Sequence, residues 1–198
     1  MSKSGYLMAV LFILFQSSLC VAEGGAQANI SIAPDPATRC HQYRADYAVA
    51  ERSTLGLMLA YDCTNRPSRP VNGNMDMSNG VSNTFNRVLV PWRYAPRGAL
   101  RDGFFVDAMV GLERAEYRTA AGSTANVHFF DVALGLGYQW FWHNGLNVSV
   151  FAGAAQLMRQ SGETNISATE SAAASDYLKL QTSTNSHLAS GAYVGWSF

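Results

Sequence analysis

The chain carries few charges and no excess of either sign. Of its 198 residues, 14 are basic and 14 are acidic, so the formal net charge at pH 7 is zero. Nucleic-acid-binding domains are characteristically basic, and disordered chains combine a high net charge with few apolar residues. The zero net charge excludes the first class. The zero net charge and the hydrophobic content of 48% together exclude the second. A single-domain globular or membrane protein remains.

The sequence also lacks an apolar run long enough to cross a membrane as a helix, which takes about 20 residues. Residues 6–15 (YLMAVLFILF) form a shorter run, preceded by Lys3 and followed by polar and small residues up to Ala22. That order is typical of a secretory signal peptide. We therefore predict that residues 1–22 are removed and that residues 23–198 form one domain outside the reducing cytoplasm.

No helical period stands out beyond the signal peptide, whereas a period of two recurs along the chain. In residues 130–140 apolar side chains occupy every second position, and the intervening positions are Asp131, Ala133, Gly135, Gly137 and Gln139. Such alternation is the signature of a strand with one apolar face. An all-β chain of eight strands is therefore predicted, at residues 28–33, 41–50, 55–62, 85–94, 106–113, 130–140, 146–155 and 187–198.

Short and long connections alternate between these strands. Residues 51–53, 96–102 and 141–145 are short turns, whereas residues 65–83, 115–126 and 158–185 are long and polar. Within the last of these, residues 176–182 show a period of two and are expected to extend a hairpin. Outer-membrane barrels have tight periplasmic turns and longer external loops. We therefore predict a closed eight-stranded antiparallel up-and-down transmembrane β-barrel.

The polar face of the predicted strands carries small residues and isolated charges. In a membrane barrel this face lines the lumen, because the apolar face meets lipid. Eight strands leave a lumen that side chains just fill, and buried charges must be paired. The expected lumen network consists of Arg44, Asp46, Asp62, Arg87, Arg93, Asp107, Glu113 and Asp131. A structural plug is the favoured interpretation, and a narrow conduit for ions or small solutes is the alternative.

Aromatic residues gather at one end of the predicted barrel once strand directions are assigned. Amphipathic rings prefer the membrane–water interface. The predicted periplasmic aromatic girdle consists of Tyr47, Trp92, Tyr94, Phe104, Tyr138, Trp140, Trp196 and Phe198, and a thinner outer girdle of Tyr43, Tyr61 and Phe130.

Three segments resemble a known group of proteins. They are residues 43–57 (YRADYAVAERSTLGL), residues 135–140 (GLGYQW) and the C-terminal residues 193–198 (YVGWSF). Together with the signal peptide, the strand number and the girdle, they resemble the small eight-stranded Gram-negative outer-membrane barrels of the opacity-type and OmpA/OmpX-like group. The last segment departs from the usual form of that group's C-terminal signal, because Tyr193 stands where a glycine is common.

The resemblance implies a monomeric integral outer-membrane protein with a structural or surface-interaction role through external loops. It also implies contact with outer-membrane lipids and lipopolysaccharide, and recognition of the C-terminal strand ending in Phe198 by the barrel-assembly machinery. No cofactor, metal ion or nucleic-acid partner is expected.

Cysteine is scarce, and only two of the three cysteines are expected in the mature chain. Cys20 leaves with the signal peptide, and its lipidation is disfavoured because Leu19 stands where a lipoprotein signal has a small residue. Cys40 and Cys63 fall near the outer ends of adjacent strands, with Cys63 expected opposite His41. This is one position off the ideal register for a disulfide, and a bulge or a frayed strand end could correct it. An oxidising compartment favours a disulfide. The alternative, a metal site that includes His41, lacks a fourth ligand.

A lipid A-modifying enzyme is the second alternative for function. Some small barrels of this membrane use a His and a Ser on the lipid-facing wall beside a carboxylate. His128 is the best outward candidate, but strand counting places Leu112 and Ala154 beside it, and His187 and Ser190 fall on opposite faces. Since no nucleophile is expected within reach of a base, we predict that the chain is not an enzyme.

Overall fold

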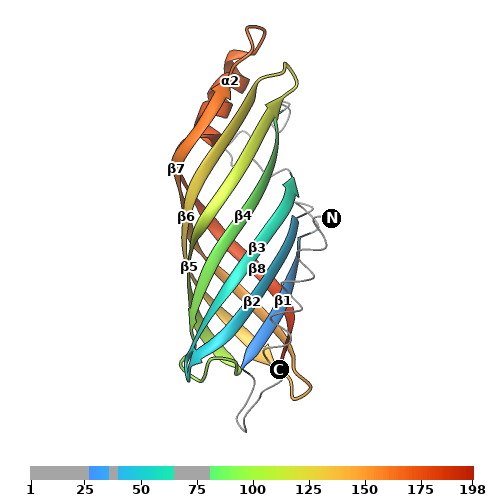
Figure 1. Cartoon of the computed structure of the whole chain (residues 1–198), viewed down its shortest axis with the longest axis vertical. Coiled ribbons are helices and arrows are strands. Elements are labelled where there is room, and N and C mark those ends of the chain that lie inside the picture. Colours follow the sequence, from blue (N-terminus) through green and yellow to red (C-terminus); the bar gives the residue numbers. More distant parts are fainter. Residues whose placement is uncertain (1–26, 36–39, 65–80) are drawn as a thin grey trace, which may run out of the picture.

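The computed structural model is an eight-stranded antiparallel barrel in up-and-down order (Figure 1). The structure describes residues 27–35, 40–64 and 81–198. The predicted signal peptide and most of the loop at residues 65–83 lie outside these ranges. The prediction of an all-β chain with eight antiparallel strands in a ring is confirmed.

Each strand pairs with its neighbour in the sequence, and the first pairs with the last. The strands are β1 (Ala28–Asp35), β2 (Cys40–Ala50), β3 (Ser53–Thr64), β4 (Val81–Tyr94), β5 (Gly103–Thr119), β6 (Thr124–Phe141), β7 (Leu146–Asn165) and β8 (Asn185–Ser197). The ring closes where β1 and β8 align Asn29 with Ser197 and Ile32 with Val194. Closure pairs the backbone N–H and C=O groups of β1 and β8, which would otherwise be exposed at open edges of the sheet.

The two faces of the wall have the polarity expected from the period of two. On the outer face, Leu112, Leu134 and Leu136 are 63%, 61% and 67% exposed. On the inner face, Asp107 and Asp131 are fully buried. The barrel therefore has apolar side chains outside and charged side chains inside.

The connections define two ends, which we call the turn end and the loop end. At the turn end, residues 51–52, 95–102 and 142–145 join successive strands. At the loop end, residues 120–123 and 166–184 join β5 to β6 and β7 to β8. The turn end is lowest in Figure 1, and the loop end is highest.

All three predicted long loops are wrong in part, because strands continue into them. β4 begins at Val81, inside the loop predicted at residues 65–83. β5 and β6 include most of residues 115–126, and β7 runs on to Asn165. Beyond the last outward apolar residues the side chains become polar, but the backbone pairing does not stop. The change of polarity therefore marks the end of the apolar band and not the end of the strands.

The hairpin predicted at residues 176–182 is wrong, since this segment lies in helix α2 (Ala172–Gln181). Ser171 caps the helix by accepting a hydrogen bond from the Ala174 backbone N–H at 3.2 Å. Ala174 and Leu178 are buried, four residues apart on one face, whereas Leu180 is exposed. No helix in the described part of the chain is long and apolar enough to cross a membrane.

Candidate functional site

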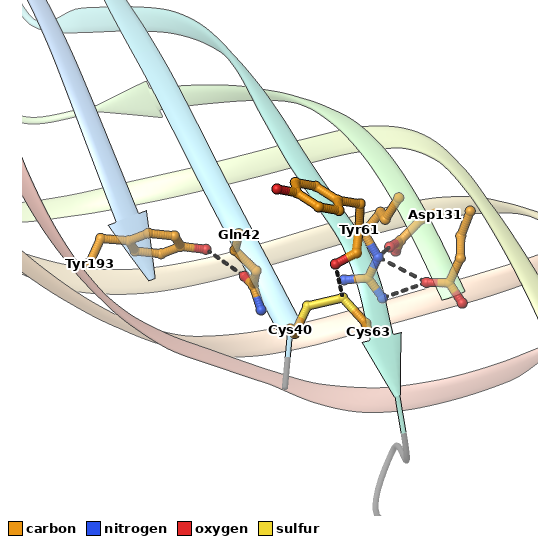
Figure 2. The surroundings of a disulfide bond; sticks show 8 residues. Cys40, Gln42, Tyr61, Cys63, Asp131 and Tyr193 are labelled. Carbon is orange, nitrogen blue, oxygen red and sulfur yellow. Dashed lines mark hydrogen bonds and ion pairs between the residues drawn. A yellow bond between two sulfur atoms is a disulfide. The ribbon is translucent and has the colours of Figure 1, made fainter. Parts of the chain in front are cut away.

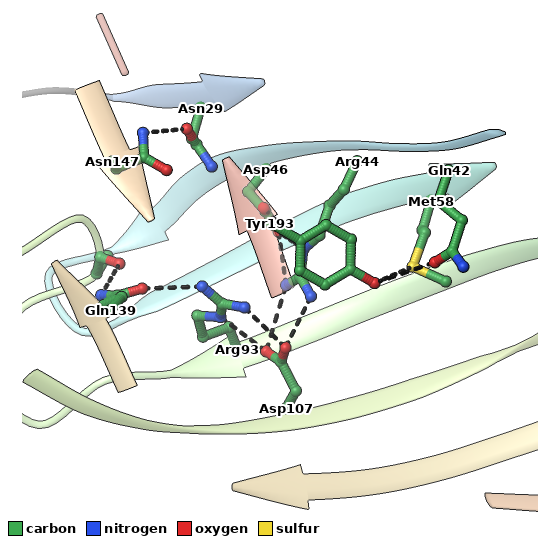
Figure 3. A network of polar contacts seen from close by, with 11 residues as sticks. Asn29, Gln42, Arg44, Asp46, Met58, Arg93, Asp107, Gln139, Asn147 and Tyr193 are labelled. Atoms are coloured by element: carbon green, nitrogen blue, oxygen red, sulfur yellow. Dashed lines mark hydrogen bonds and ion pairs between the residues drawn. The ribbon is translucent and has the colours of Figure 1, made fainter. Parts of the chain in front are cut away.

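The first charged cluster in the lumen is built around Asp107 on β5 (Figure 3). Arg44 Nη1 donates to Asp107 Oδ2 at 2.7 Å, and Arg93 Nε donates to Asp107 Oδ1 at 2.8 Å. Arg44 also donates to Asp46 at 2.8 Å, and Arg93 Nη1 to Gln139 Oε1 at 2.8 Å. All five side chains are buried. One carboxylate thus holds two guanidinium groups from two different strands.

A second charged cluster lies farther toward the loop end. Arg87 donates to Glu113 Oε2 at 2.7 Å, and its Nε lies 3.1 Å from Asp131 Oδ2. Buried Leu89 on β4 and Met109 on β5 separate the two clusters along the wall. The lumen is therefore layered, with two charged clusters and an apolar layer between them.

Several residues of this interior were not predicted. Gln139 extends the first cluster by donating to the Arg101 carbonyl at 2.7 Å, and Asn147 donates to Asn29 Oδ1 at 2.7 Å. Tyr193 is buried in the apolar layer. All four residues, Asn29, Gln139, Asn147 and Tyr193, sit at inward positions of the alternating pattern. That position was the sequence signal that could have identified them. The side chain of Asp62, predicted as part of the network, lies outside the described ones.

The mouth of the lumen at the loop end is filled by apolar side chains. A cluster of buried residues there includes Phe85, Val127, Phe129, Leu157 and Leu178. Leu178 belongs to α2, so the helix packs into this layer. The Tyr117 hydroxyl donates to the Gln181 carbonyl at 3.4 Å at the end of the helix. The interior is closed at this end by side chains of the barrel and of α2 together.

The segment before α2 is attached to the tip of the β5–β6 hairpin. The Thr119 hydroxyl donates to the Glu170 carboxylate, and the Ser167 N–H donates to the Ser123 hydroxyl at 2.9 Å. Hydrogen bonds from Ser123 and Thr119 lower the pKa of Glu170 below its ordinary value of 4.5. We call this set of contacts the loop latch.

Cys40 and Cys63 form a disulfide between β2 and β3 (Figure 2). The expected register is wrong, since His41 lies opposite Tyr61 and not opposite Cys63. A bulge on β3 between Ala60 and Cys63 adds a residue to that strand. An added residue reverses which face the next side chain occupies, so Cys63 turns into the interior beside Cys40.

The aromatic residues predicted as a periplasmic girdle lie at the turn end. Trp92 stacks with Tyr94 at a ring distance of 6.4 Å. Tyr138 contacts Phe104 and Trp140, at ring distances of 4.9 and 4.8 Å. The remaining predicted members, Tyr47, Trp196 and Phe198, lie near this end on β2 and at the C-terminus, and the first two are exposed.

The neighbours expected beside His128 are wrong. Its register partners are Arg114 on β5 and Ser161 on β7, and not Leu112 and Ala154. The strands continue past the apolar band, and a bulge on β7 shifts the register between His128 and the next residue. The outer wall therefore carries a row of Arg114, His128 and Ser161, which we call the outer polar row.

These features define the class of protein as a small up-and-down β-barrel with a closed, charged interior. No family model matches the chain, and no curated protein matches it. Among solved structures, a major outer membrane protein from Thermus thermophilus is similar, with a TM-score of 0.47 and 12% identity. The match covers 86% of this chain and 99% of that one.

Proposed function

We propose that the chain is an integral outer-membrane β-barrel protein with a structural or surface-interaction role. The distribution of polarity carries this proposal. Leu134 and Leu136 lie mid-wall and are more than 60% exposed, while Asp107 and Asp131 are fully buried. In water, a protein would bury the leucines and expose the aspartates. A closed barrel in lipid requires apolar side chains on its outer face, because that face is solvated by acyl chains and the backbone is paired internally.

The height of the apolar band supports the same proposal. On β5 every outward residue from Phe104 to Leu112 is apolar. At roughly 3.3 Å per residue and a tilt of about 40°, this stretch covers about 20 Å along the barrel axis, close to the apolar band of ~25 Å found in such barrels. Aromatic rings at the turn end would then lie at one membrane interface.

The loop end would face outward. Residues 166–184 are rich in Ser, Thr and Ala, and in membrane barrels the longer connections are the external ones. Exposed loops on a rigid scaffold commonly carry recognition. The surface-interaction role is therefore assigned to this end of the molecule.

Two measurements test membrane insertion. Folded outer-membrane barrels resist SDS until boiled, so unboiled and boiled samples are expected to migrate differently in SDS gels. The protein is also expected to fractionate with outer membranes. Identical migration together with recovery in the soluble periplasmic fraction would contradict the proposal.

The filled interior supports a plug in preference to a conduit for ions or small solutes. Arg44 on β2 and Asp107 on β5, whose side chains are 1% and 0% exposed, form an ion pair between non-adjacent strands within the lumen. Planar-bilayer recordings of the refolded protein are expected to show no conductance steps. Reproducible steps would make the conduit the better assignment.

Phe198 takes part in closing the barrel, and these contacts support a role of this strand in assembly. The Phe198 N–H donates to the Ala28 carbonyl at 3.0 Å, and its own carbonyl accepts from Ala28. We propose that the assembly machinery recognises this C-terminal strand and that the product is a monomer. Phe198→Ala is expected to lower the yield of heat-modifiable protein in cells.

The outer polar row gives the enzyme alternative a serine beside its histidine. His128 and Ser161 lie directly opposite each other. However, no contact among the described residues joins His128 to a carboxylate, the group that would orient its imidazole. We therefore keep the non-enzymatic role. Unchanged lipid A mass spectra in a Ser161→Ala strain are the expected result.

A further inference from the structure

The outer polar row occupies one defined level of the wall. Arg114 lies opposite His128, and His128 lies opposite Ser161, on three successive strands. All three residues are exposed. Side chains directly opposite each other on one face have Cβ atoms about 5 Å apart. The three polar groups can therefore converge on one small ligand.

The row stands immediately beyond the apolar band. The preceding outward residues toward the turn end are Leu112 on β5, Phe130 on β6 and Met158 on β7, and these three also lie opposite one another. If the barrel crosses the membrane as proposed, the outer polar row lies where the acyl chains of the outer leaflet end and the headgroups begin.

The cation of this row is unlike the next cation on the same strand. Arg118, four residues farther out on β5, donates through Nε to Glu116 at 2.8 Å. The side chain of Arg114 makes no hydrogen bond or ion pair with any residue that the structure describes. A guanidinium at a membrane interface that has no counterion among the described residues is available to an anionic headgroup.

A local irregularity of β7 places the serine. Gln160 is the extra residue of a bulge, since Phe129 pairs with Arg159 and His128 with Ser161. Arg159 Nη2 donates to the Gly162 carbonyl at 3.0 Å. Gly162 has φ of 148°, and a Cβ there would clash with the Asn126 carbonyl oxygen. Bulges of this kind re-aim side chains, and here the outcome is a hydroxyl beside His128.

We propose that Arg114, His128 and Ser161 bind a phosphate group of an anionic lipid in the outer leaflet. The guanidinium offers two parallel donors that match phosphate oxygens, the imidazole offers an N–H and the serine an O–H. Glu163 lies one row farther out, opposite Asn126, and so toward water. The inference rests on the proposed insertion of the barrel and names a lipid site on its surface.

Native mass spectrometry of the detergent-refolded full chain tests the site, with bisphosphorylated lipid A as the probe. Arg114→Ala and His128→Ala are each expected to weaken lipid retention roughly tenfold, which corresponds to about 1.4 kcal/mol. Arg118→Ala is the matched control, because it removes a cation from the same strand and face. It is expected to retain the lipid as the wild type does.

Two further binding measurements test whether the phosphate group of the lipid is what the site recognises. Lipid A stripped of its phosphates is expected to bind the wild type no better than it binds Arg114→Ala, and inorganic phosphate is expected to compete with the intact lipid. Equal retention of phosphorylated and stripped lipid would overturn the proposal, as would equal losses in Arg114→Ala and Arg118→Ala. Each variant is first checked for heat-modifiable migration, so that failed insertion is distinguished from a failed site.

Discussion

At the scale of single residues, the lumen depends on Asp107 more than on any other carboxylate. It accepts hydrogen bonds from Arg44 and Arg93, which come from β2 and β4. Phe105 supports the same cluster, since the Arg93 guanidinium lies 3.6 Å from its ring centroid. Buried charges of this kind are tolerated only while every partner is present.

Asp107→Asn is expected to destabilise the barrel strongly. The substitution keeps the shape of the side chain but leaves two buried guanidinium groups without their shared anion, which costs about 3–5 kcal/mol. Urea unfolding in lipid vesicles, followed by tryptophan fluorescence, measures the loss. Glu116→Gln is the control, because its pair with Arg118 is exposed and worth about 1 kcal/mol or less. Equal effects of the two variants would refute the structural role of the network.

The disulfide between Cys40 and Cys63 is expected to stabilise the barrel. Cys40 and Cys63 are 23 residues apart in the sequence, and closing a loop of that length stabilises a folded chain by about 3 kcal/mol. A Cys40→Ser/Cys63→Ser double variant is expected to unfold at correspondingly lower urea concentrations. Alkylation with and without reductant shows whether the thiols are bonded. Complete alkylation of both cysteines in the unreduced, denatured wild type would contradict the bond.

At the scale of elements, the loop end contains more regular structure than short connections between strands would have. β5, β6 and β7 extend beyond the apolar band, and α2 packs over the mouth through Ala174 and Leu178. The loop latch joins the segment before α2 to the β5–β6 tip. The loop end is therefore ordered by its own contacts and offers a defined surface.

Acidification is expected to weaken the loop latch. Hydrogen bonds from Ser123 and Thr119 lower the pKa of Glu170 below 4.5, so its charged form stabilises the latch. That contribution is present above pH 4.5 and is lost as the pH falls through the lower folded value. NMR titration of the Glu170 side-chain carboxyl measures this pKa, and Thr119→Val is expected to raise it. A pKa at or above 4.5 in the wild type would contradict the latch.

At the scale of the whole molecule, the barrel has apolar side chains outside and paired charges inside, the arrangement that the proposed membrane insertion requires. A charged residue on the outer face should therefore be costly at mid-height and tolerated outside the band. Leu134 on β6 and Leu180 on α2 are both exposed leucines, but only Leu134 belongs to the apolar band. They make a matched pair for testing where the membrane lies.

Leu134→Arg is expected to lower the free energy of unfolding in vesicles by about 2–4 kcal/mol, the cost of a cation near the bilayer midplane. Leu180→Arg is expected to change it by less than about 0.5 kcal/mol, as for an ordinary surface substitution. Urea unfolding in the same vesicles measures both. A negligible effect of Leu134→Arg would place the outer wall in water.

The sequence determined the eight strands, their inward and outward faces, and those charged residues of the lumen whose side chains the structure describes. Alternation depends only on the pleat of each strand, so it can be read from neighbours along the chain. For this reason Arg44, Arg93 and Asp107 were assigned to one interior without knowledge of their contacts.

Only the tertiary structure decided which of these residues meet. Partners across strands depend on register, and a bulge adds a residue that alternation does not reveal. The bulges on β3 and β7 therefore decided that Cys63 turns inward beside Cys40 and that Ser161 lies beside His128. Helix α2 likewise depends on burial of Leu178 against the barrel mouth, a contact between segments distant in the sequence.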